Sequence, residues 1–207
     1  MSSDRRSDAP SPRPDELGPL VRSRGAPLLE ALTEHVPDAE EHADATASYA
    51  FIAAVELGLG RDRCELYRDA TKLHEIGLVY LPAEVASKQA SARTTAEAAA
   101  FDGHYEAGYR LARGAGIPER VCGWLLRQRE RFDGSGPEGL AGERIPIESR
   151  LMRAACVCQT ALVADEPGDA QNPLARAQET LDAAAGTELD PQVVQALTAL
   201  LRRARSA

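Results

Sequence analysis

The sequence predicts an all-α domain, and three observations support this fold class. Alanine is abundant and aromatic residues make up only 4% of the 207 residues, a composition that suits closely packed helices with small side chains. Apolar residues recur at helical spacing along most of the chain. No stretch alternates apolar and polar residues in the way that a half-buried strand requires. We therefore expect a helical bundle formed by one domain of ordinary size.

The first 17 residues are expected to form a disordered arm, followed by a helical domain over residues 18–207. The arm is mostly polar, and its proline-containing run at 9–14 cannot sustain a helix. It has no apolar core of a signal peptide, and no stretch of the chain approaches the roughly 18 consecutive apolar residues of a membrane span. The cysteines show no CxxC spacing. We therefore expect a cytoplasmic protein with reduced thiols and no association with membranes.

Proline and glycine residues mark the ends of most of the expected helices. Gly25 to Pro27 interrupts the first helix, Gly77 is a natural stop for the third, and Pro118 and Pro146 open later ones. A polar loop is expected at 165–173, before two short terminal helices of which the last starts at Asp190. The earlier helices are expected at about 20–32, 37–58, 61–76, 94–112, 118–133 and from 146 onwards.

Net charge limits the kinds of partner that the chain can have. The formal net charge is -8 at pH 7. A general DNA-binding or RNA-binding protein needs a basic face, so the composition argues against nucleic acid as a partner. A local basic patch for one small anionic ligand remains compatible with it.

Several segments contain residues with metal-ligand chemistry. His42, His74 and His104 fall on or near predicted helices, and His74 is followed directly by Glu75. Imidazole and carboxylate groups that come from several helices are common ligands of catalytic metals. A glycine-rich stretch at 132–140 has the composition of a loop that contacts a substrate.

Together these segments resemble an HD-GYP domain, a branch of the HD phosphohydrolase superfamily. The resemblance covers roughly residues 38–200, and six segments carry it in order and spacing. They are Glu41-His42, Leu73–Gly77, Gly103–Gly108, Glu130–Pro137, Gly139–Pro146 and Gly186–Pro191. Similar domains are helical bundles that hold two or three metal ions and hydrolyse cyclic di-GMP. The resemblance therefore implies an HD-GYP-like helical bundle in bacterial nucleotide signalling.

The resemblance also assigns metal-binding positions to this chain. His42 and His74 match ligands of the first metal, and His104 matches a ligand of the second. Glu75 stands where the family has the aspartate that bridges the metals, and it would be the catalytic carboxylate if the domain is active. Asp38 could take the place of a glutamate that serves a third metal in some members.

Other family positions have changed. The adjacent histidine pair of the second metal site is replaced by Gln128 and Arg129, and the late aspartate ligand by Cys156. The lysine that helps to hold phosphate is Leu78 here. The tyrosine of the GYP motif is absent, because Gly136 is followed directly by Pro137. These changes predict that the second metal site is lost.

Two interpretations of the remaining site stay open. In the first, His42, His74, Glu75 and Cys156 bind one divalent metal, with zinc favoured over iron or manganese because of the thiolate. In the second, no metal is bound, the histidines are satisfied core residues and Cys156 is a small buried apolar group. His104 alone is expected to be structural or to face solvent.

The arginines near the glycine-rich loop also allow two interpretations. Arg129 and Arg131, with Gly134, Gly136 and Pro137, could hold a phosphate-bearing ligand without cleaving it. The alternative is a loop whose glycines only permit tight turns, bordered by a solvated basic edge. We also expect Arg129 to form a buried pair with Glu75, because buried charges need partners.

The sequence therefore favours a degenerate HD-GYP-like domain without efficient phosphodiesterase activity, which acts as a regulatory or protein-interaction module. The loss of the paired histidines, the late aspartate and the lysine removes the two-metal arrangement that such hydrolysis uses. One alternative is a phosphohydrolase with a single retained zinc site, and another is a non-catalytic cyclic di-GMP sensor. A signalling protein or a cyclic dinucleotide is the expected partner, and the oligomeric state is left open.

Overall fold

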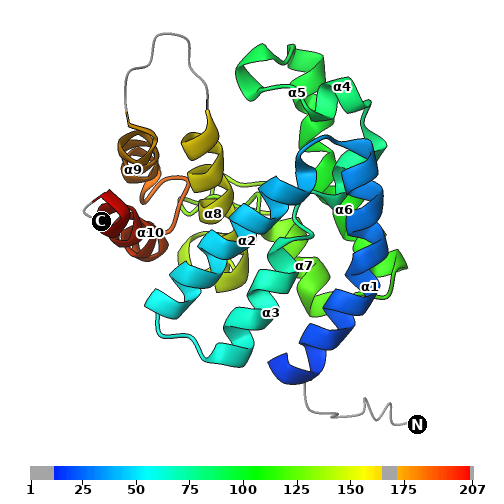
Figure 1. The fold of residues 1–207 in the computed structure, drawn as a ribbon, viewed down its shortest axis with the longest axis horizontal. Helices are drawn as coiled ribbons and strands as arrows, with labels where there is room; N and C mark the ends of the chain where they lie inside the picture. Colours follow the sequence, from blue (N-terminus) through cyan, green and yellow to red (C-terminus); the bar gives the residue numbers. More distant parts are fainter. Residues whose placement is uncertain (1–11, 165–171, 206–207) are drawn as a thin grey trace, which may run out of the picture.

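The structure is a computed structural model that describes residues 12–164 and 172–205. These residues form α-helices and short 3-10 helices, with no β-strand among them, which confirms the all-α prediction (Figure 1). The helices are α1 (Pro14–His35), α2 (Ala39–Glu56), α3 (Arg61–Thr71), η1 (Ile76–Tyr80), α4 (Ala83–Ala86), η2 (Ala90–Ala92), α5 (Thr95–Asp102), α6 (His104–Gly114), α7 (Glu119–Arg127), η3 (Gly142–Arg144), α8 (Ile147–Val163), α9 (Pro173–Ala184) and α10 (Pro191–Arg205). None of them is long and apolar enough to cross a bilayer.

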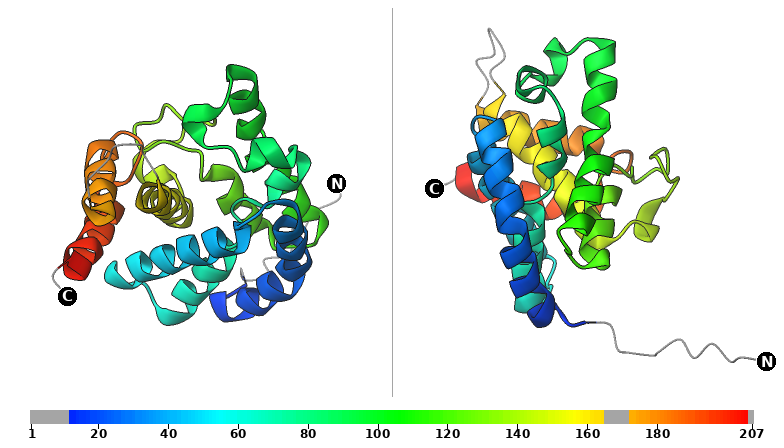
Figure 2. Two further views of the ribbon diagram at one scale, coloured as in Figure 1. Left: turned by 45° about the horizontal axis from the view of Figure 1, so that its top comes forward. Right: turned by 90° about the vertical axis from the view of Figure 1, so that its right-hand side faces the viewer.

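Helix α2 occupies a central position in the bundle. It packs against both α3 and α8, while α9 and α10 cover α8 on one side and α1 and α6 lie on the other side (Figures 1 and 2). Most of the buried residues of α2 are alanines, such as Ala47, Ala50 and Ala54. Such small side chains allow two neighbouring helices to approach one helix closely. The abundance of alanine in the sequence thus has a direct role in the packing.

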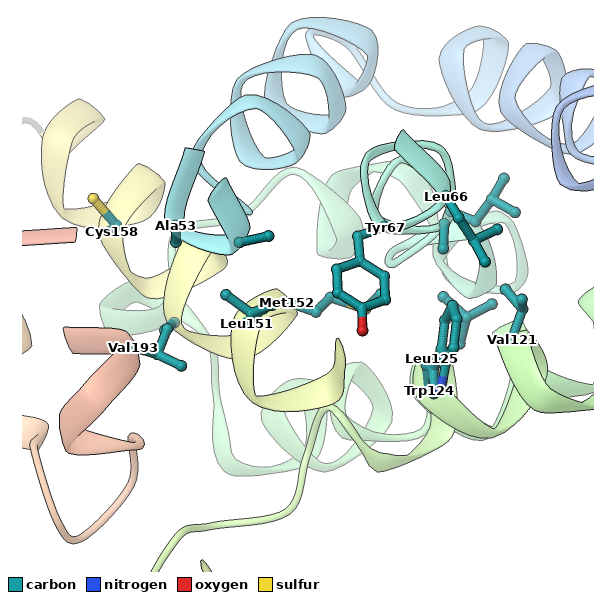
Figure 3. Packing of buried hydrophobic residues seen from close by; sticks show 14 of the residues in the cluster. Ala53, Leu66, Tyr67, Val121, Trp124, Leu125, Leu151, Met152, Cys158 and Val193 are labelled. Atoms are coloured by element: carbon teal, nitrogen blue, oxygen red, sulfur yellow. The ribbon is translucent and has the colours of Figure 1, made fainter. Parts of the chain in front are cut away.

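Larger side chains fill the core between α3, α7 and α8. The rings of Tyr67 and Trp124 meet edge to face, with centroids 5.5 Å apart, and Leu125, Leu151 and Met152 surround them (Figure 3). Edge-to-face contact is a favoured geometry for aromatic pairs. The core therefore joins the helix that precedes His74 to the helix that carries Cys156.

Helix α1 differs from its prediction in two ways. It starts at Pro14, so residues 14–17 are helical, and Leu17 is fully buried. Proline suits the first turn of a helix, and the side chain of Glu16 accepts a hydrogen bond from the Arg13 backbone N–H at 3.0 Å. The helix also continues through Pro27, because Pro27 is exposed and the carbonyl that loses its partner can be solvated. The rest of the predicted arm, residues 1–11, lies outside the described residues.

Two other predicted helices are shorter or divided in the structure. Helix α3 ends at Thr71 instead of continuing to residue 76, and a turn follows it. The helix predicted over 94–112 begins as expected, with Thr94 as its cap, but it breaks at Gly103 into α5 and α6. Both breaks change the direction of the chain beside the histidines. They place His74 in the turn between α3 and η1, and His104 at the first position of α6.

The turn after α3 is held tightly against α6. At Gly77 an added Cβ would lie only 1.8 Å from the carbonyl oxygen of His104 and 2.6 Å from the backbone nitrogen of Gly108. A side chain cannot fit at that distance, so only glycine lets η1 and α6 meet backbone to backbone. This contact fixes the segment that holds His74 and Glu75 relative to His104.

Candidate metal centre and the adjoining pocket

Four potential metal ligands meet in the centre of the bundle. His42 comes from α2, His74 and Glu75 from the turn before η1, and Cys156 from α8. One donor atom of each lies within 4.8 Å of the donor atoms of the other three. The sequence analysis named this same set of four residues. Among the residues that the structure describes, it is the only group of this kind.

His74 is fixed in an orientation that suits a metal ligand. Its Nδ1 donates a hydrogen bond to the carbonyl of Thr71 at 2.8 Å, so the proton is on Nδ1 and the lone pair on Nε2 points toward His42, whose Nε2 lies 3.2 Å away. Burial lowers the pKa of His74 to about 4, which keeps the ring neutral at neutral pH. Gln128 donates from its side-chain amide to the His74 carbonyl at 2.9 Å. The segment is therefore anchored from two sides.

The other donors differ in protonation. Burial acts to raise the pKa of Glu75, but electrostatic interactions with the neighbouring histidines and with Arg93 outweigh this effect and keep the pKa below its usual value, so the group is a carboxylate. Burial and the charge of Glu75 raise the pKa of Cys156 to about 12. The thiol therefore keeps its proton at neutral pH unless a cation replaces that proton.

The donor types and two of the distances between donors suit a zinc ion. The Nε2 atom of His42 lies 3.2 Å from Nε2 of His74 and 3.5 Å from Oε2 of Glu75. Tetrahedral zinc with bonds of roughly 2.0–2.1 Å places its nitrogen and oxygen ligands about 3.3–3.4 Å apart. His42, His74, Glu75 and Cys156 would hold such an ion. Cys158 is fully buried in the core and lies outside this group, as expected from its place on α8.

The residues at the positions of the second metal make other contacts. Gln128 is buried and also donates to the carbonyl of Leu125 at 3.0 Å. Arg129 pairs with Asp102 at 3.1 Å, so the predicted pair between Arg129 and Glu75 is wrong. Arg129 pairs with Asp102 rather than Glu75 because α5 ends at Asp102, where the break before α6 brings this carboxylate close to Arg129.

His104 is buried but is not part of the group of four donors. Its Nδ1 donates to the carbonyl of Phe101 at 2.5 Å, which leaves Nε2 as an acceptor. That Nε2 atom is buried and has no hydrogen-bond partner in the part of the chain that the structure describes, and the side chain is 1% exposed. Of the two predicted environments for His104, a structural position or one that faces solvent, the structure has the buried, structural one. Asp38 is exposed, lies at the start of α2 with a positive φ of 62°, and is also outside the group.

The glycine-rich loop is held in place by a buried carboxylate. Glu130 accepts hydrogen bonds from the backbone N–H groups of Glu138 at 2.7 Å and Leu140 at 2.8 Å. At Gly136 an added Cβ would lie 2.7 Å from the backbone nitrogen of Arg131, so the loop needs glycine there. Gly134 has a φ of 87°, which also favours glycine.

This loop forms one wall of a pocket of about 340 Å³. The lining includes Arg129, Arg131, Gly136 and Pro137 from the sequence prediction, but not Gly134. It also includes residues that the sequence analysis did not single out, namely Asp102, Tyr105, Ser135 and Arg153. One signal could have identified Arg153, since it precedes Cys156 by three residues and so shares a face of α8 with it.

A larger groove, of about 640 Å³, lies between α7 and the start of α8 and contains none of the four candidate ligands. Its arginines are paired with carboxylates: Arg63 and Arg120 contact Glu148 at 3.3 and 3.7 Å, and Arg127 contacts Glu138 at 3.0 Å. Its lining contains no histidine or cysteine, so this groove offers no imidazole or thiol ligand for a metal ion.

Comparison with known proteins decides the family. A model of the HD domain family matches residues 27–193, which is most of the chain. The chain belongs to the HD-domain family. This HD domain is also similar to curated cyclic di-GMP phosphodiesterases and to solved HD-GYP structures, which confirms the prediction of an HD-GYP-like bundle.

The curated relatives are longer than this HD domain. It is 34% identical over 149 residues to the cyclic di-GMP phosphodiesterase response regulator RpfG of Xanthomonas campestris, a match that covers 70% of this chain and 39% of the relative. It is 30% identical over 115 residues to the cyclic di-GMP phosphodiesterase PdeB of Borreliella burgdorferi, covering 55% and 30%. The HD domain thus spans only two fifths or less of the length of these two relatives.

Solved structures show the same fold at low sequence identity. An HDG"Y"P protein from Bdellovibrio bacteriovorus has a TM-score of 0.66 at 18% identity, covering 91% of this chain and 62% of that one. The HD domain of the phosphodiesterase PgpH from L. monocytogenes, in complex with cyclic-di-AMP, has a TM-score of 0.62 at 15% identity, covering 87% and 95%. These likenesses support the fold of the HD domain described above.

Proposed function

We propose that this HD domain is a degenerate HD-GYP-like module that holds one zinc ion and does not hydrolyse cyclic di-GMP efficiently. It would act as a regulatory or protein-interaction module in bacterial nucleotide signalling. The observation that carries the proposal is the set of four protein donors at one site, together with the other contacts made by Gln128 and Arg129. The curated relatives support the signalling context, since they are named as cyclic di-GMP phosphodiesterases.

The number of protein ligands matters for catalysis. Structural zinc sites are closed by four protein ligands, whereas catalytic zinc sites have three and keep an open position. His42, His74, Glu75 and Cys156 supply four ligands, so the set resembles a closed site. The position of the phosphate-holding lysine is taken by Leu78, which is buried and uncharged. The arrangement therefore favours a stabilised scaffold over hydrolysis.

One observation favours a second candidate function, a phosphohydrolase with a retained metal centre. The Nε2 atom of His104 is buried and has no hydrogen-bond partner among the described residues, and His104 lies close enough to Glu75 for an electrostatic interaction between them. When bound, a metal ion can act as a Lewis acid toward a phosphate oxygen. In this candidate, His104 and Glu75 would help to hold a second ion.

Metal content and hydrolysis, measured on the same preparation, test the proposal. The full chain is purified without a tag or chelator, its metals are quantified by mass spectrometry, and cyclic di-GMP is incubated with it and analysed by chromatography. We expect about one zinc per chain and no turnover above the protein-free control. Two metals per chain with turnover of cyclic di-GMP would contradict the proposal. Turnover of bis-p-nitrophenyl phosphate alone would support the second candidate.

The thiol at Cys156 predicts a pH dependence of zinc affinity. Its pKa of about 12 means that zinc must displace a proton from the thiol, whereas His74 is already neutral at any pH well above 4. Affinity should therefore rise with pH, by about one log unit per pH unit around neutrality from this group. The measurement is a competition titration against a zinc chelator at several pH values, corrected for the chelator's own protonation.

The variant Cys156→Asp is the control for this pH dependence. An aspartate is already ionised at neutral pH, so no proton has to leave it when the metal binds. The variant should still bind a divalent metal, with a shallower pH dependence and a weaker preference for zinc over manganese. Equal slopes in the two proteins would show that Cys156 is not a ligand.

A further inference from the structure

The pocket of about 340 Å³ beside the metal centre brings together side chains from four parts of the chain. Asp102 and Tyr105 come from the ends of α5 and α6 that meet at Gly103. Arg129 and Arg131 follow α7, and Arg153 lies on α8. The loop residues Ser135 to Pro137 complete the lining. Its charged lining residues are three arginines and one carboxylate, and two carboxylates outside the lining, Asp133 and Glu188, also pair with the arginines.

The pocket adjoins the candidate metal centre. The ring of Tyr105 lies against the ring of His104, with centroids 3.8 Å apart. Arg153 lies one helical turn before Cys156, on the same face of α8. Tyr105 also lines the pocket, where its hydroxyl can donate a hydrogen bond to a ligand. A ligand in the pocket would therefore lie on the side of the metal centre where His104 and α8 meet the pocket lining.

The arginines are held in position by carboxylates, two of which are outside the lining. Glu188 accepts from Nε of Arg153 at 2.9 Å and from NH1 of Arg131 at 3.3 Å. Arg131 also donates to Ser135 Oγ at 2.9 Å and lies 3.8 Å from Asp133. Each guanidinium has five N–H donors, so these contacts leave further donors for a ligand.

The position of Arg129 adds to this arrangement. It pairs with Asp102 at 3.1 Å, and its guanidinium lies 5.2 Å from the centre of the Tyr105 ring. It stands where the family resemblance expects a histidine of the second metal site. A fixed positive charge therefore occupies the region where a second metal would bring positive charge.

We propose that Arg129, Arg131 and Arg153 bind the phosphate group of a nucleotide in this pocket, so that binding requires no second metal ion. This inference rests on the proposed function and names the ligand of that site. Guanidinium groups suit phosphate oxygens because they donate two parallel hydrogen bonds. They also supply no nucleophile, so a bound nucleotide is retained rather than cleaved. The volume is near the lower end of ligand pockets, which span roughly 300–1,000 Å³, and this favours entry of a single nucleotide unit.

Calorimetric titration of the zinc-loaded full chain, in buffer without magnesium or manganese, tests the inference. Two ligands are used: cyclic di-GMP, which has only phosphodiester groups, and GMP, which has a terminal phosphate. We expect at least one of them to bind, and the one that binds identifies the source of the phosphate. Arg153→Ala should weaken that binding by about tenfold or more, as expected for the loss of hydrogen bonds to a charged group.

Two further variants make the result specific. Arg153→Lys keeps the charge but loses the paired donors, so its affinity should fall between those of Arg153→Ala and the wild type. Arg144→Ala is the matched control, because Arg144 is an exposed arginine in η3, just after the loop, and is not part of the lining. It should bind as the wild type does.

The outcomes separate this inference from the proposed function. If neither nucleotide binds, or if Arg153→Ala binds as tightly as the wild type while its zinc content is unchanged, the inference is overturned. Chromatography of the titrated sample shows whether the nucleotide was consumed. Hydrolysis of the nucleotide would contradict the proposed function. If binding still depends on Arg153 in that case, the assignment of the pocket as the phosphate site is supported.

Discussion

Replacing Cys156 with alanine should leave the purified domain with less than about a tenth of a zinc ion per chain. The variant retains His42, His74 and Glu75, but it loses the only sulfur donor among the four candidate ligands. The loss of a thiolate removes the ligand that most favours zinc. Because a bound metal stabilises the folded state, the melting temperature should also fall and should no longer respond to added zinc.

Cys158→Ala provides the matched control for this experiment. The two cysteines are on the same helix, but Cys158 is fully buried in the core and lies outside the group of candidate ligands. Its replacement should reduce stability modestly through the small cavity that it creates, and zinc content should stay at the wild-type level. Metal content is measured by mass spectrometry, and melting by calorimetry. Wild-type zinc in Cys156→Ala would show that the thiol is not a ligand.

Gly77→Ala should destabilise the domain by more than about 4 kcal/mol, or prevent folding altogether. The added Cβ would lie 1.8 Å from the His104 carbonyl oxygen, and the neighbouring atoms are backbone atoms that cannot rotate away. Accommodation would require η1 to separate from α6. Because His74 and Glu75 directly precede η1, a shift of η1 would also move these two ligands, and any folded fraction should bind zinc weakly.

Urea denaturation followed by circular dichroism measures this effect. Gly114→Ala is the matched control, because Gly114 is also helical and has open space around the position of a Cβ. That change should leave stability unaltered or raise it by roughly 0.5–1 kcal/mol, since alanine is the better helix former. A denaturation midpoint of Gly77→Ala equal to that of the wild type would rule out the close contact between η1 and α6.

Local signals in the sequence were sufficient to predict the all-α fold, whereas the grouping of the four donors came from the family resemblance and from no local pattern. Thr94 begins a helix as expected, because a cap depends on residues that are three positions apart. Gly77 was interpreted as a helix stop, but its main constraint is the backbone of α6, which is distant in sequence. The division at Gly103 was missed for a similar reason, since the contact between η1 and α6 determines where α6 must start.

The pocket was harder to predict than the donor group. The motif segments named Arg129 and Arg131, but they contained no information on which carboxylate each arginine would meet. Glu188, which positions Arg131 and Arg153, lies between α9 and α10 and belongs to no local pattern with either arginine. Charge pairs between distant segments have no periodicity, so only the folded structure identifies them.

The buried carboxylate of Glu130 has a consequence for how fast a ligand can bind. By accepting two backbone N–H groups of the loop, it removes conformational freedom from the segment that carries Gly136 and Pro137 before any ligand arrives. A ligand that meets a loop already in its final shape loses little additional entropy on ordering it. Association at this wall of the pocket should therefore proceed in a single kinetic phase, without a slow rearrangement of the loop.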